Sequence, residues 1–274
     1  MSPSPYSDLD RPPLNANALT RALVRPGGLW REIRVIEETG STNTDLADLA
    51  RGGAAPGLVL VAEAQTSGRG RMGRVWTAPP RSGLAFSVLL PPEDSITRLG
   101  WLPLVAGVAV VSALRGFTEV EGAERGRMAD AVLKWPNDVL IGERKLAGIL
   151  AQRVDAGVII GIGLNVSLRT DELPVPTATS LAIEDAPTDR DPLLRAILRE
   201  LAARHEEFAA GGEAAMRETY RALCATLGRQ VRVELPDGSV IAGEATDIEE
   251  AGRLVVRGPD GEHLLNAGDV VHVR

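Results

Sequence analysis

The chain has 274 residues, of which 44% are hydrophobic and 24% charged, a composition typical of a soluble globular protein that excludes wholesale disorder. Its 30 lysines and arginines are outnumbered by 37 aspartates and glutamates, so the net charge of −7 argues against a non-specific nucleic-acid binder. The single cysteine, Cys224, excludes a disulfide framework and a cysteine-ligated zinc site, and we interpret it as a small buried residue on a helix.

The first 28 residues are rich in proline, and we predict a flexible N-terminal segment with a short helix at 18–24. They contain no hydrophobic run of the length found in a secretory leader. The longest apolar stretch, 102–114, is too short to span a bilayer, so we predict a buried core helix there. We therefore expect a cytoplasmic protein that does not enter a membrane.

Residues 29–227 are predicted to form the main domain, in which strands and helices interleave. The strands are expected at 33–36, 58–62, 84–90, 131–135, 139–141, 146–151 and 158–166, and the helices after Ser41, at 98–115, at 192–208 and at 213–227. Tight turns between the later strands favour antiparallel neighbours. The fold class predicted from this order is α+β, with a mixed, mainly antiparallel sheet flanked by helices.

The composition changes at Gly228. Val231, Val233 and Leu235 alternate with charged residues, and Gly-containing turns punctuate the remaining chain. Five short strands in residues 228–274 predict a small all-β barrel. A unit of this size is marginal alone, so we expect it to dock on the larger domain.

The segment Gly68–Arg74 combines three glycines with three arginines in seven residues. Glycine lets a backbone approach a ligand closely, and arginine offers a permanently charged fork suited to carboxylates and phosphates. The formal G-x-G-x-x-G pattern is a weak dinucleotide fingerprint here, because prolines soon follow where a helix should begin. We predict an anion-binding flap. The alternative is a solvated surface loop without a binding role.

Three further segments carry polar groups or glycines where a strand would otherwise be apolar. Lys134–Asp138 contains a cation, an amide and a carboxylate, and Asp138 could hold magnesium, orient Lys134, or simply cap the next strand. Lys145 opens an apolar run, so it needs an anion unless it is the exposed start of a strand. Gly161 and Gly163 remove side chains from one face of a strand, which indicates close approach of a ligand or another backbone.

Other chemistries find no support in the sequence. The histidines His205, His263 and His272 lie away from these segments, and we interpret them as surface or satisfied residues. No nucleophile-elbow serine, transition-metal motif or Walker pattern is present, so a bound ATP would need another scheme.

Taken in order, these motifs resemble those of the biotin protein ligases. The matching segments are Ser41–Asn43, Gln65 with Gly68–Trp76, Lys134–Asp138, Lys145–Leu150 and Gly161–Val166, and the likeness extends over about residues 30–274. The resemblance implies a catalytic domain related to class II aminoacyl-tRNA synthetases and lipoate ligases, followed by a Src-homology-3-like barrel. It implies ATP with Mg2+, and biotin as substrate.

The resemblance also implies a two-step reaction and a set of site residues. Biotin and ATP would give biotinyl-5′-AMP, which the acceptor lysine of a biotin carboxyl carrier domain would attack. The biotin-binding residues it implies are Ser41, Thr42, Asn43, Gln65, Arg69, Gly70, Arg71, Lys145 and Gly163. Lys145, Arg69 and Arg71 would be catalytic. The nucleotide side would contain Arg71, Trp76, Asn137, Asp138 and Asn165, with no dedicated protein metal site but magnesium near Asp138.

Bifunctional members of this family carry an N-terminal helix-turn-helix domain of about 60 residues. Only about 28 residues precede the catalytic domain here, so we expect the monofunctional type without specific DNA binding. A monomer and a weak dimer both remain open. The alternatives are a lipoate–protein ligase of the same superfamily and a non-catalytic nucleic-acid-binding protein.

Overall fold

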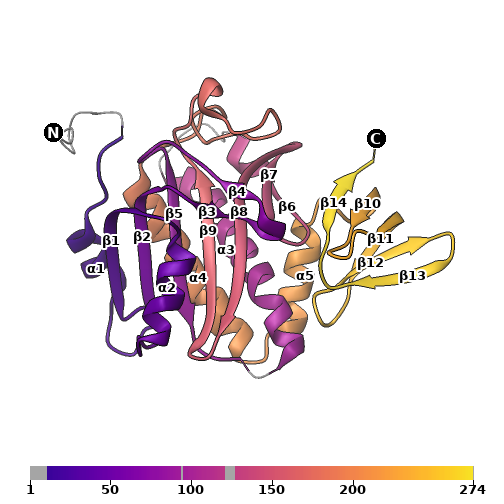
Figure 1. Cartoon of the computed structure of the whole chain (residues 1–274), viewed down its shortest axis with the longest axis horizontal. Coiled ribbons are helices and arrows are strands. Elements are labelled where there is room, and N and C mark those ends of the chain that lie inside the picture. The colour runs from indigo at the N-terminus through magenta and orange to yellow at the C-terminus, as the bar shows by residue number, and fades with distance from the viewer. Residues whose placement is uncertain (1–10, 94, 121–126, 274) are drawn as a thin grey trace.

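A computed structural model describes residues 11–93, 95–120 and 127–273. Its centre is a seven-stranded sheet in the order β1-β2-β5-β9-β8-β7-β6, in which β1 and β2 are parallel and all other neighbours antiparallel (Figure 1). The strands are β1 (Glu32–Thr39), β2 (Leu58–Gln65), β5 (Gly83–Leu90), β6 (Ala131–Lys134), β7 (Asp138–Ile141), β8 (Arg144–Val154) and β9 (Gly157–Asn165). The predicted mixed, mainly antiparallel sheet is confirmed.

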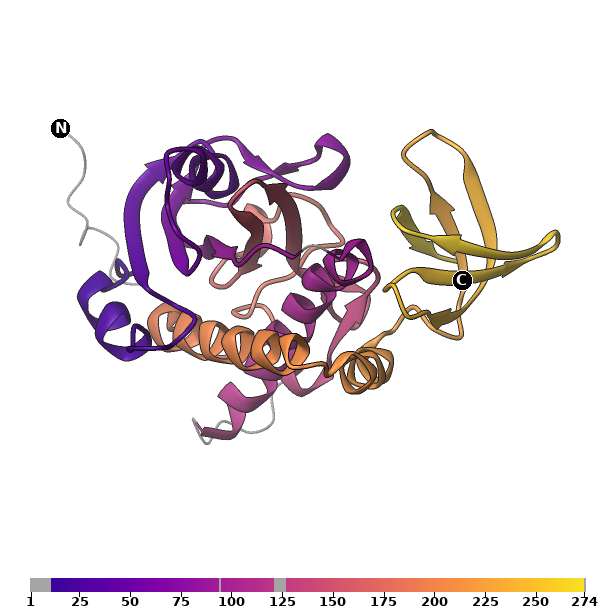
Figure 2. The same ribbon diagram turned by 90° about the horizontal axis from the view of Figure 1, so that it is seen from below.

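Helices cover the two faces of this sheet unequally (Figure 2). The helices α3 (Ile96–Val120) and α4 (Arg190–Ala209) pack on one face, and α2 (Thr42–Arg51) lies on the other. Strand β2 shows the division, because Val59 and Val61 belong to the large core while Leu58 and Leu60 pack under α2. One short helix cannot cover seven strands, so part of the α2 face is available to bind a ligand.

Helix α3 is longer than the predicted 98–115. By length and composition, Ile96–Phe117 could cross a membrane, but most of its apolar window is buried inside the protein. Leu104, Val108 and Val111 are fully or almost fully buried against the sheet and α4. The helix is therefore a core helix, as the sequence analysis expected of this stretch.

The N-terminal segment differs from the flexible tail that we predicted for residues 1–28. Residues 1–10 lie outside the described residues, but α1 (Ala16–Leu23) packs Leu19 and Leu23 into the main core. Arg11 bonds Glu172, and the Leu14 N–H donates to Glu63 at 2.6 Å. The apolar face of α1, this ion pair and this hydrogen bond attach residues 11–28 to the main domain, because detaching the segment would expose that face to water.

The C-terminal strands confirm an all-β unit but not a closed barrel. The strands β10 (Gln230–Glu234), β11 (Val240–Ile248), β12 (Leu254–Gly258), β13 (Gly261–Leu265) and β14 (Asp269–His272) form one antiparallel sheet. Its order is β13-β12-β11-β10-β14, so within the part of the chain that the structure describes β13 and β14 are edges and no ladder closes the sheet. The boundary at Gly228 agrees with the start of β10, and it stays a prediction as a domain limit.

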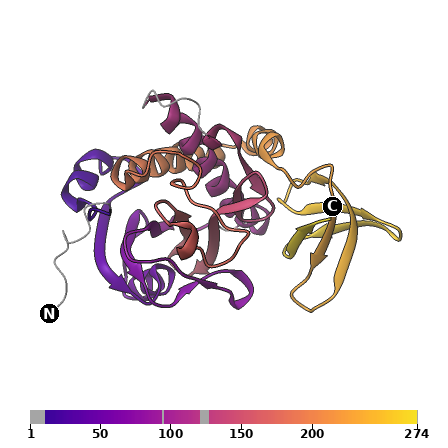
Figure 3. The same ribbon diagram turned by 90° about the horizontal axis from the view of Figure 1, so that it is seen from above.

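This sheet docks on the main domain at the end opposite α1 (Figure 3). The indole N–H of Trp101 donates to the Glu250 carbonyl at 2.7 Å, and that of Trp135 to Gly252 at 3.1 Å. The preceding helix α5 (Glu213–Leu223) stops before Cys224, which is buried but lies after the helix rather than on it. The docking places β14 beside the β7–β6 end of the large sheet (Figure 1).

Candidate active site

A pocket of about 610 Å³ lies on the α2 face, between the large sheet and the C-terminal sheet. The flap (residues 68–76) crosses it as a small hairpin of β3 (Gly68–Arg69) and β4 (Val75–Trp76), joined by one turn of 3-10 helix at Arg71–Gly73. Within the flap, Met72 and Gly73 adopt positive φ angles of 53° and 74°. The glycine-rich sequence is therefore used for a tight reversal that holds the arginines over the pocket.

One end of the pocket is lined by neutral polar groups. Thr42 donates to Gln65 Oε1 through its backbone N–H (2.9 Å) and its hydroxyl (3.1 Å). The buried hydroxyl of Ser87 on β5 lies 2.7 Å from Thr42 Oγ1 and 2.6 Å from Asn43 Oδ1. Ser41 occupies the N-cap position of α2 without a side-chain cap bond, and its side chain is buried at the pocket wall. The amides and hydroxyls of Ser41, Thr42, Asn43 and Gln65 line the pocket and can bind an uncharged ligand group that both donates and accepts hydrogen bonds, while Ser87 lies behind them.

The glycines of β9 explain how α2 and the flap approach the sheet so closely. A Cβ on Gly161 would overlap the amide of Asn43. A Cβ on Gly163 would lie 2.5 Å from Trp76 Cε2, so the indole fills the space left by this glycine. Close approach occurs at both positions, but the neighbours are side chains and not the ligand or backbone that we predicted. At Gly163, however, the neighbour is the flap's own Trp76, in the space where we had expected biotin.

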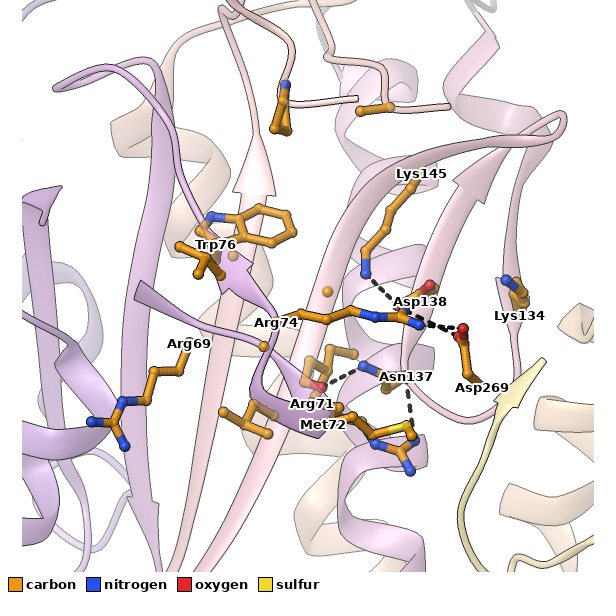
Figure 4. A pocket seen from close by; sticks show the side chains of 18 of the residues that line it. Arg69, Arg71, Met72, Arg74, Trp76, Lys134, Asn137, Asp138, Lys145 and Asp269 are labelled. Atoms are coloured by element: carbon orange, nitrogen blue, oxygen red, sulfur yellow. Dashed lines mark hydrogen bonds and ion pairs between the residues drawn. The ribbon is translucent and has the colours of Figure 1, made fainter. Parts of the chain in front are cut away.

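The other end of the pocket gathers charged groups (Figure 4). Lys145 Nζ lies 2.7 Å from Asp138 Oδ1, and Arg71 donates to Asn137 Oδ1 at 3.4 Å. Arg74 makes a two-pronged ion pair with Asp269 of β14. Asp138 thus pairs with Lys145 and not with Lys134, which was one of our alternatives. The flap and the C-terminal sheet are tied together directly over the pocket.

Two hydrogen bonds hold the backbone of Lys145. Its N–H donates to Thr177 O at 2.7 Å, and its carbonyl accepts from Thr179 N–H at 2.9 Å. The same loop is tied to β9, since Asn165 Nδ2 donates to the Thr179 carbonyl at 2.9 Å. The amide of Asn165 is thus occupied in holding the loop, although the residue lines the pocket. These hydrogen bonds fix the backbone of Lys145 and therefore the position of its Cβ, from which the side chain extends into the pocket.

Burial and neighbouring charges shift the pKa values of several side chains at the charged end of the pocket. Burial lowers the pKa of Arg71, opposed by the nearby carboxylates of Asp138 and Asp269. Burial tends to raise the pKa of Asp269, but the Arg74 guanidinium together with Lys134 and Lys145 outweighs it, so the net pKa is lowered. Burial, Arg229 and Lys134 lower the pKa of His272. The pocket therefore presents fixed positive charge partly removed from water, where electrostatic interactions with an anion are strong.

All the site residues named from the sequence line this one pocket: Ser41, Thr42, Asn43, Gln65, Arg69, Gly70, Arg71, Trp76, Asn137, Asp138, Lys145, Gly163 and Asn165. Their grouping is uneven, because Arg69 is exposed and lies apart from the charged cluster that Arg71 and Arg74 face (Figure 4). Among the described residues no group of three or more His, Cys, Asp or Glu side chains could hold a metal ion.

Sequence reasoning missed several contributors. His272 lines the pocket, which corrects our interpretation of the histidines as remote from it, and Asp269 lines it from the same strand. Nothing local marks either residue, since both arrive through docking of the C-terminal sheet. Ser87 was also missed, although a serine inside the apolar run 84–90 was a usable signal, because a buried hydroxyl needs a partner.

Comparisons with known proteins agree with this arrangement. Residues 35–165 match the model of the Biotin/lipoate A/B protein ligase family, and residues 226–273 match that of the Biotin protein ligase C terminal domain. The chain is 42% identical to a biotin–[acetyl-CoA-carboxylase] ligase of Mycobacterium tuberculosis, over 96% of this chain and 97% of that protein. It is 31% identical to the bifunctional ligase/repressor BirA of Escherichia coli, over 82% of this chain and 68% of that one.

Among solved structures, a biotin protein ligase from Aquifex aeolicus in complex with biotin and ATP superposes with a TM-score of 0.75 at 29% identity. The superposition covers 89% of this chain and all of the Aquifex chain, so both the main domain and the C-terminal sheet are shared.

Proposed function

The chain belongs to the biotin protein ligase family, and we propose that it activates biotin with ATP and transfers it to a carboxylase carrier domain. The supporting observation is a single pocket with neutral hydrogen-bonding groups at one end and Lys145, Arg71 and Arg74 at the other. Biotin has this polarity, with an uncharged ureido ring at one end and a carboxylate at the other.

The first step joins two anions, the biotin carboxylate and the α-phosphate of ATP. Two unit charges 4 Å apart repel by about 4 kcal/mol at an effective dielectric constant of about 20. The cations of the charged end would offset this repulsion, and their stabilisation grows as charge develops on the phosphate in the transition state. The carboxylate oxygen attacks the α-phosphorus and pyrophosphate leaves. No side-chain nucleophile is required, so catalysis is positioning plus electrostatics.

At the neutral end, we assign the ureido ring to Ser41, Thr42, Asn43 and Gln65. The two N–H groups and the carbonyl of the ring match this mixture of acceptors and donors. We assign Lys145 to the reacting carboxylate and α-phosphate oxygens, Arg71 to both the biotin and the nucleotide side, and Arg69 with Gly70 to closure of the flap. Asn137, Asp138 and Asn165 lie on the nucleotide side.

Trp76 would have to leave its present place over Gly163 for a ligand to lie on that strand. The flap that carries it is a short hairpin with a glycine-rich turn, so such a movement changes few backbone contacts. In the open site the indole is our candidate for stacking on adenine.

Magnesium would enter with the phosphates of ATP. Of the carboxylates that line the pocket, Asp138 and Asp269 pair with Lys145 and Arg74, and Glu143 pairs with Arg229, so these residues do not form a dedicated cage for a cation. Magnesium typically keeps several waters and binds through one or two carboxylates and the substrate phosphates. Asp138 fits the role of such a single ligand, and the metal would neutralise phosphate charge.

In the second step, the ε-amine of the acceptor lysine attacks the biotinyl carbonyl carbon. The carbon–oxygen bond to AMP breaks, AMP leaves with the electron pair, and the nitrogen loses a proton as the amide forms. We propose a carrier domain of a biotin-dependent carboxylase as acceptor, a cytoplasmic location, and no specific recognition of DNA.

Pyrophosphate exchange tests the proposal. The protein is mixed with Mg-ATP, radiolabelled pyrophosphate and either biotin or lipoate, and label entering ATP is measured. Biotin-dependent exchange supports the proposal. Exchange that depends on lipoate would identify a lipoate ligase, and absence of exchange with both would favour a non-catalytic binding protein. A gel shift with biotin operon operators, expected to be negative, tests the absence of DNA recognition.

A further inference from the structure

Lysine is almost absent from this chain. Of its 30 basic residues only Lys134 and Lys145 are lysines, and all the others are arginines. Lysine is normally among the commonest residues of soluble proteins. Both lysines line the pocket (Figure 4). A general preference for arginine explains the low number, but not why lysine is retained only at the proposed site of adenylate chemistry.

The two basic side chains differ in their reactivity toward an acyl adenylate. A lysine amine with a pKa of about 10.4 is deprotonated in roughly one molecule in 2,500 at pH 7, and this fraction is nucleophilic. Arginine stays protonated and offers no comparable nucleophile. An amine held near the pocket mouth would also face the bound intermediate at an effective concentration on the order of millimolar. A surface lysine within reach is therefore a competitor for the acceptor lysine.

The mouth of the pocket carries no lysine side chain in the described part of the chain. Its half-exposed lining residues include the aliphatic side chains of Val75, Val175 and Val271, with exposed fractions of 70%, 49% and 50%. The cations there include Arg74, with an exposed fraction of 60%. These positions are open to solvent and would tolerate lysine sterically. These exposed mouth positions thus keep positive charge without an amine, and the lysine amines at the pocket are those of Lys134 and Lys145 in the charged cluster.

Two other nucleophiles in the described part of the chain are protected by burial. Cys224 is buried, and burial raises the pKa of its thiol, which disfavours the reactive thiolate. Tyr220 is buried too, with an exposed fraction of 1%. Of the two lysines, Lys145 forms an ion pair with Asp138, and Lys134 lies at the end of β6 in the charged cluster (Figure 4).

We propose that the exclusion of lysine from the pocket mouth protects this protein from acylation by its own bound biotinyl-AMP. The inference rests on the proposed function, since it needs the adenylate to form. The avoided step is the transfer reaction on the wrong amine: a surface lysine attacks the carbonyl carbon, AMP leaves with the electron pair, a proton goes to solvent, and an amide remains on the enzyme.

The test introduces a lysine where the chain excludes one. Val271→Lys and Val175→Lys place an amine on two sides of the mouth. Leu264→Lys is the matched control, because Leu264 lies on the same small sheet as Val271 with a similar exposed fraction of 48%, but does not line the pocket. Each purified full-length protein is incubated with biotin and Mg-ATP without acceptor. Incorporated biotin is measured by intact mass and located by peptide mapping, and pyrophosphate exchange is measured in parallel.

We expect at least tenfold more self-biotinylation in one or both mouth variants than in the wild type, located at the introduced lysine, with the control near the wild-type level. The inference is overturned if exchange proceeds but neither mouth variant is labelled. It is equally overturned if the wild type is labelled as strongly, at Lys134, Lys145 or the amino terminus, or if Leu264→Lys matches the mouth variants. If wild-type exchange is absent, the proposed function fails and the inference fails with it.

Discussion

The hydroxyl of Ser87 is expected to position the residues that bind the ureido ring. It lies within 2.7 Å of both Thr42 Oγ1 and Asn43 Oδ1, and Ser87 is fully buried. In Ser87→Ala, a buried acceptor on Asn43 loses its partner, which costs about 1–3 kcal/mol. Within the described part of the chain, the Asn43 side chain then keeps only the bond from its Nδ2 to the Leu150 carbonyl at 3.3 Å and is less firmly oriented. A share of about 1.4 kcal/mol of this loss would appear as a tenfold larger dissociation constant for biotin.

The assay is calorimetric titration of biotin without nucleotide, together with the KM for ATP and the melting temperature. We expect a tenfold weaker affinity for biotin, an unchanged KM for ATP, and a melting temperature lowered by about 2–4 °C per kcal/mol.

A second buried serine provides the control. Ser180 is also fully buried, and its hydroxyl donates to the Leu168 carbonyl at 2.6 Å, away from the pocket lining. Ser180→Ala should lose comparable stability while keeping the wild-type affinity for biotin. Equal biotin affinities in the two variants would refute the positioning role of Ser87 and leave it a purely structural residue.

Four further changes test other parts of the site. Lys145→Ala should lower pyrophosphate exchange by orders of magnitude with little change in melting temperature, and activity within tenfold of the wild type would contradict its role. Arg69→Ala should raise the KM for biotin and release the adenylate, measured as labelled intermediate passing a desalting column. Asp269→Asn should weaken the tie to Arg74 and make the flap more susceptible to trypsin, an effect absent if the flap closes independently of the C-terminal sheet. Because the pKa of His272 is lowered in the folded protein, below about pH 6.5 the unfolded chain binds a proton more readily than the folded protein does. The free energy of unfolding should therefore fall as the pH drops from 7.5 to 5.5. The urea midpoint of His272→Asn should fall less than that of the wild type over the same range.

The alternation of side chains made much of the fold readable from the sequence. The continuous apolar run at 58–62 correctly indicated a strand buried on both faces, because its odd and even residues pack into different cores. The glycines at 161 and 163 correctly indicated close approach to the strand, although side chains occupy the space that we predicted for a ligand or backbone. Every ligand-binding residue that we named from the motifs also lines the same pocket.

Long-range docking could not be read in the same way. The attachment of residues 11–28 depends on Glu63, Glu172 and Arg190, which lie 49 or more residues away along the chain. The predicted closed barrel was wrong because β13 and β14 do not pair with each other, and the strand sequences do not show which strands will pair.

The sequence by itself determined the family, the strand order along the chain and the chemistry of the flap, because these are written in local patterns and residue types. Only the tertiary structure decided that Asp269 and His272 reach the pocket, that Trp76 covers Gly163, and that Asp138 pairs with Lys145. Such contacts follow from how the two sheets pack against each other. Packing depends on the combined shape of many side chains that are distant in the sequence, so no local motif predicts it.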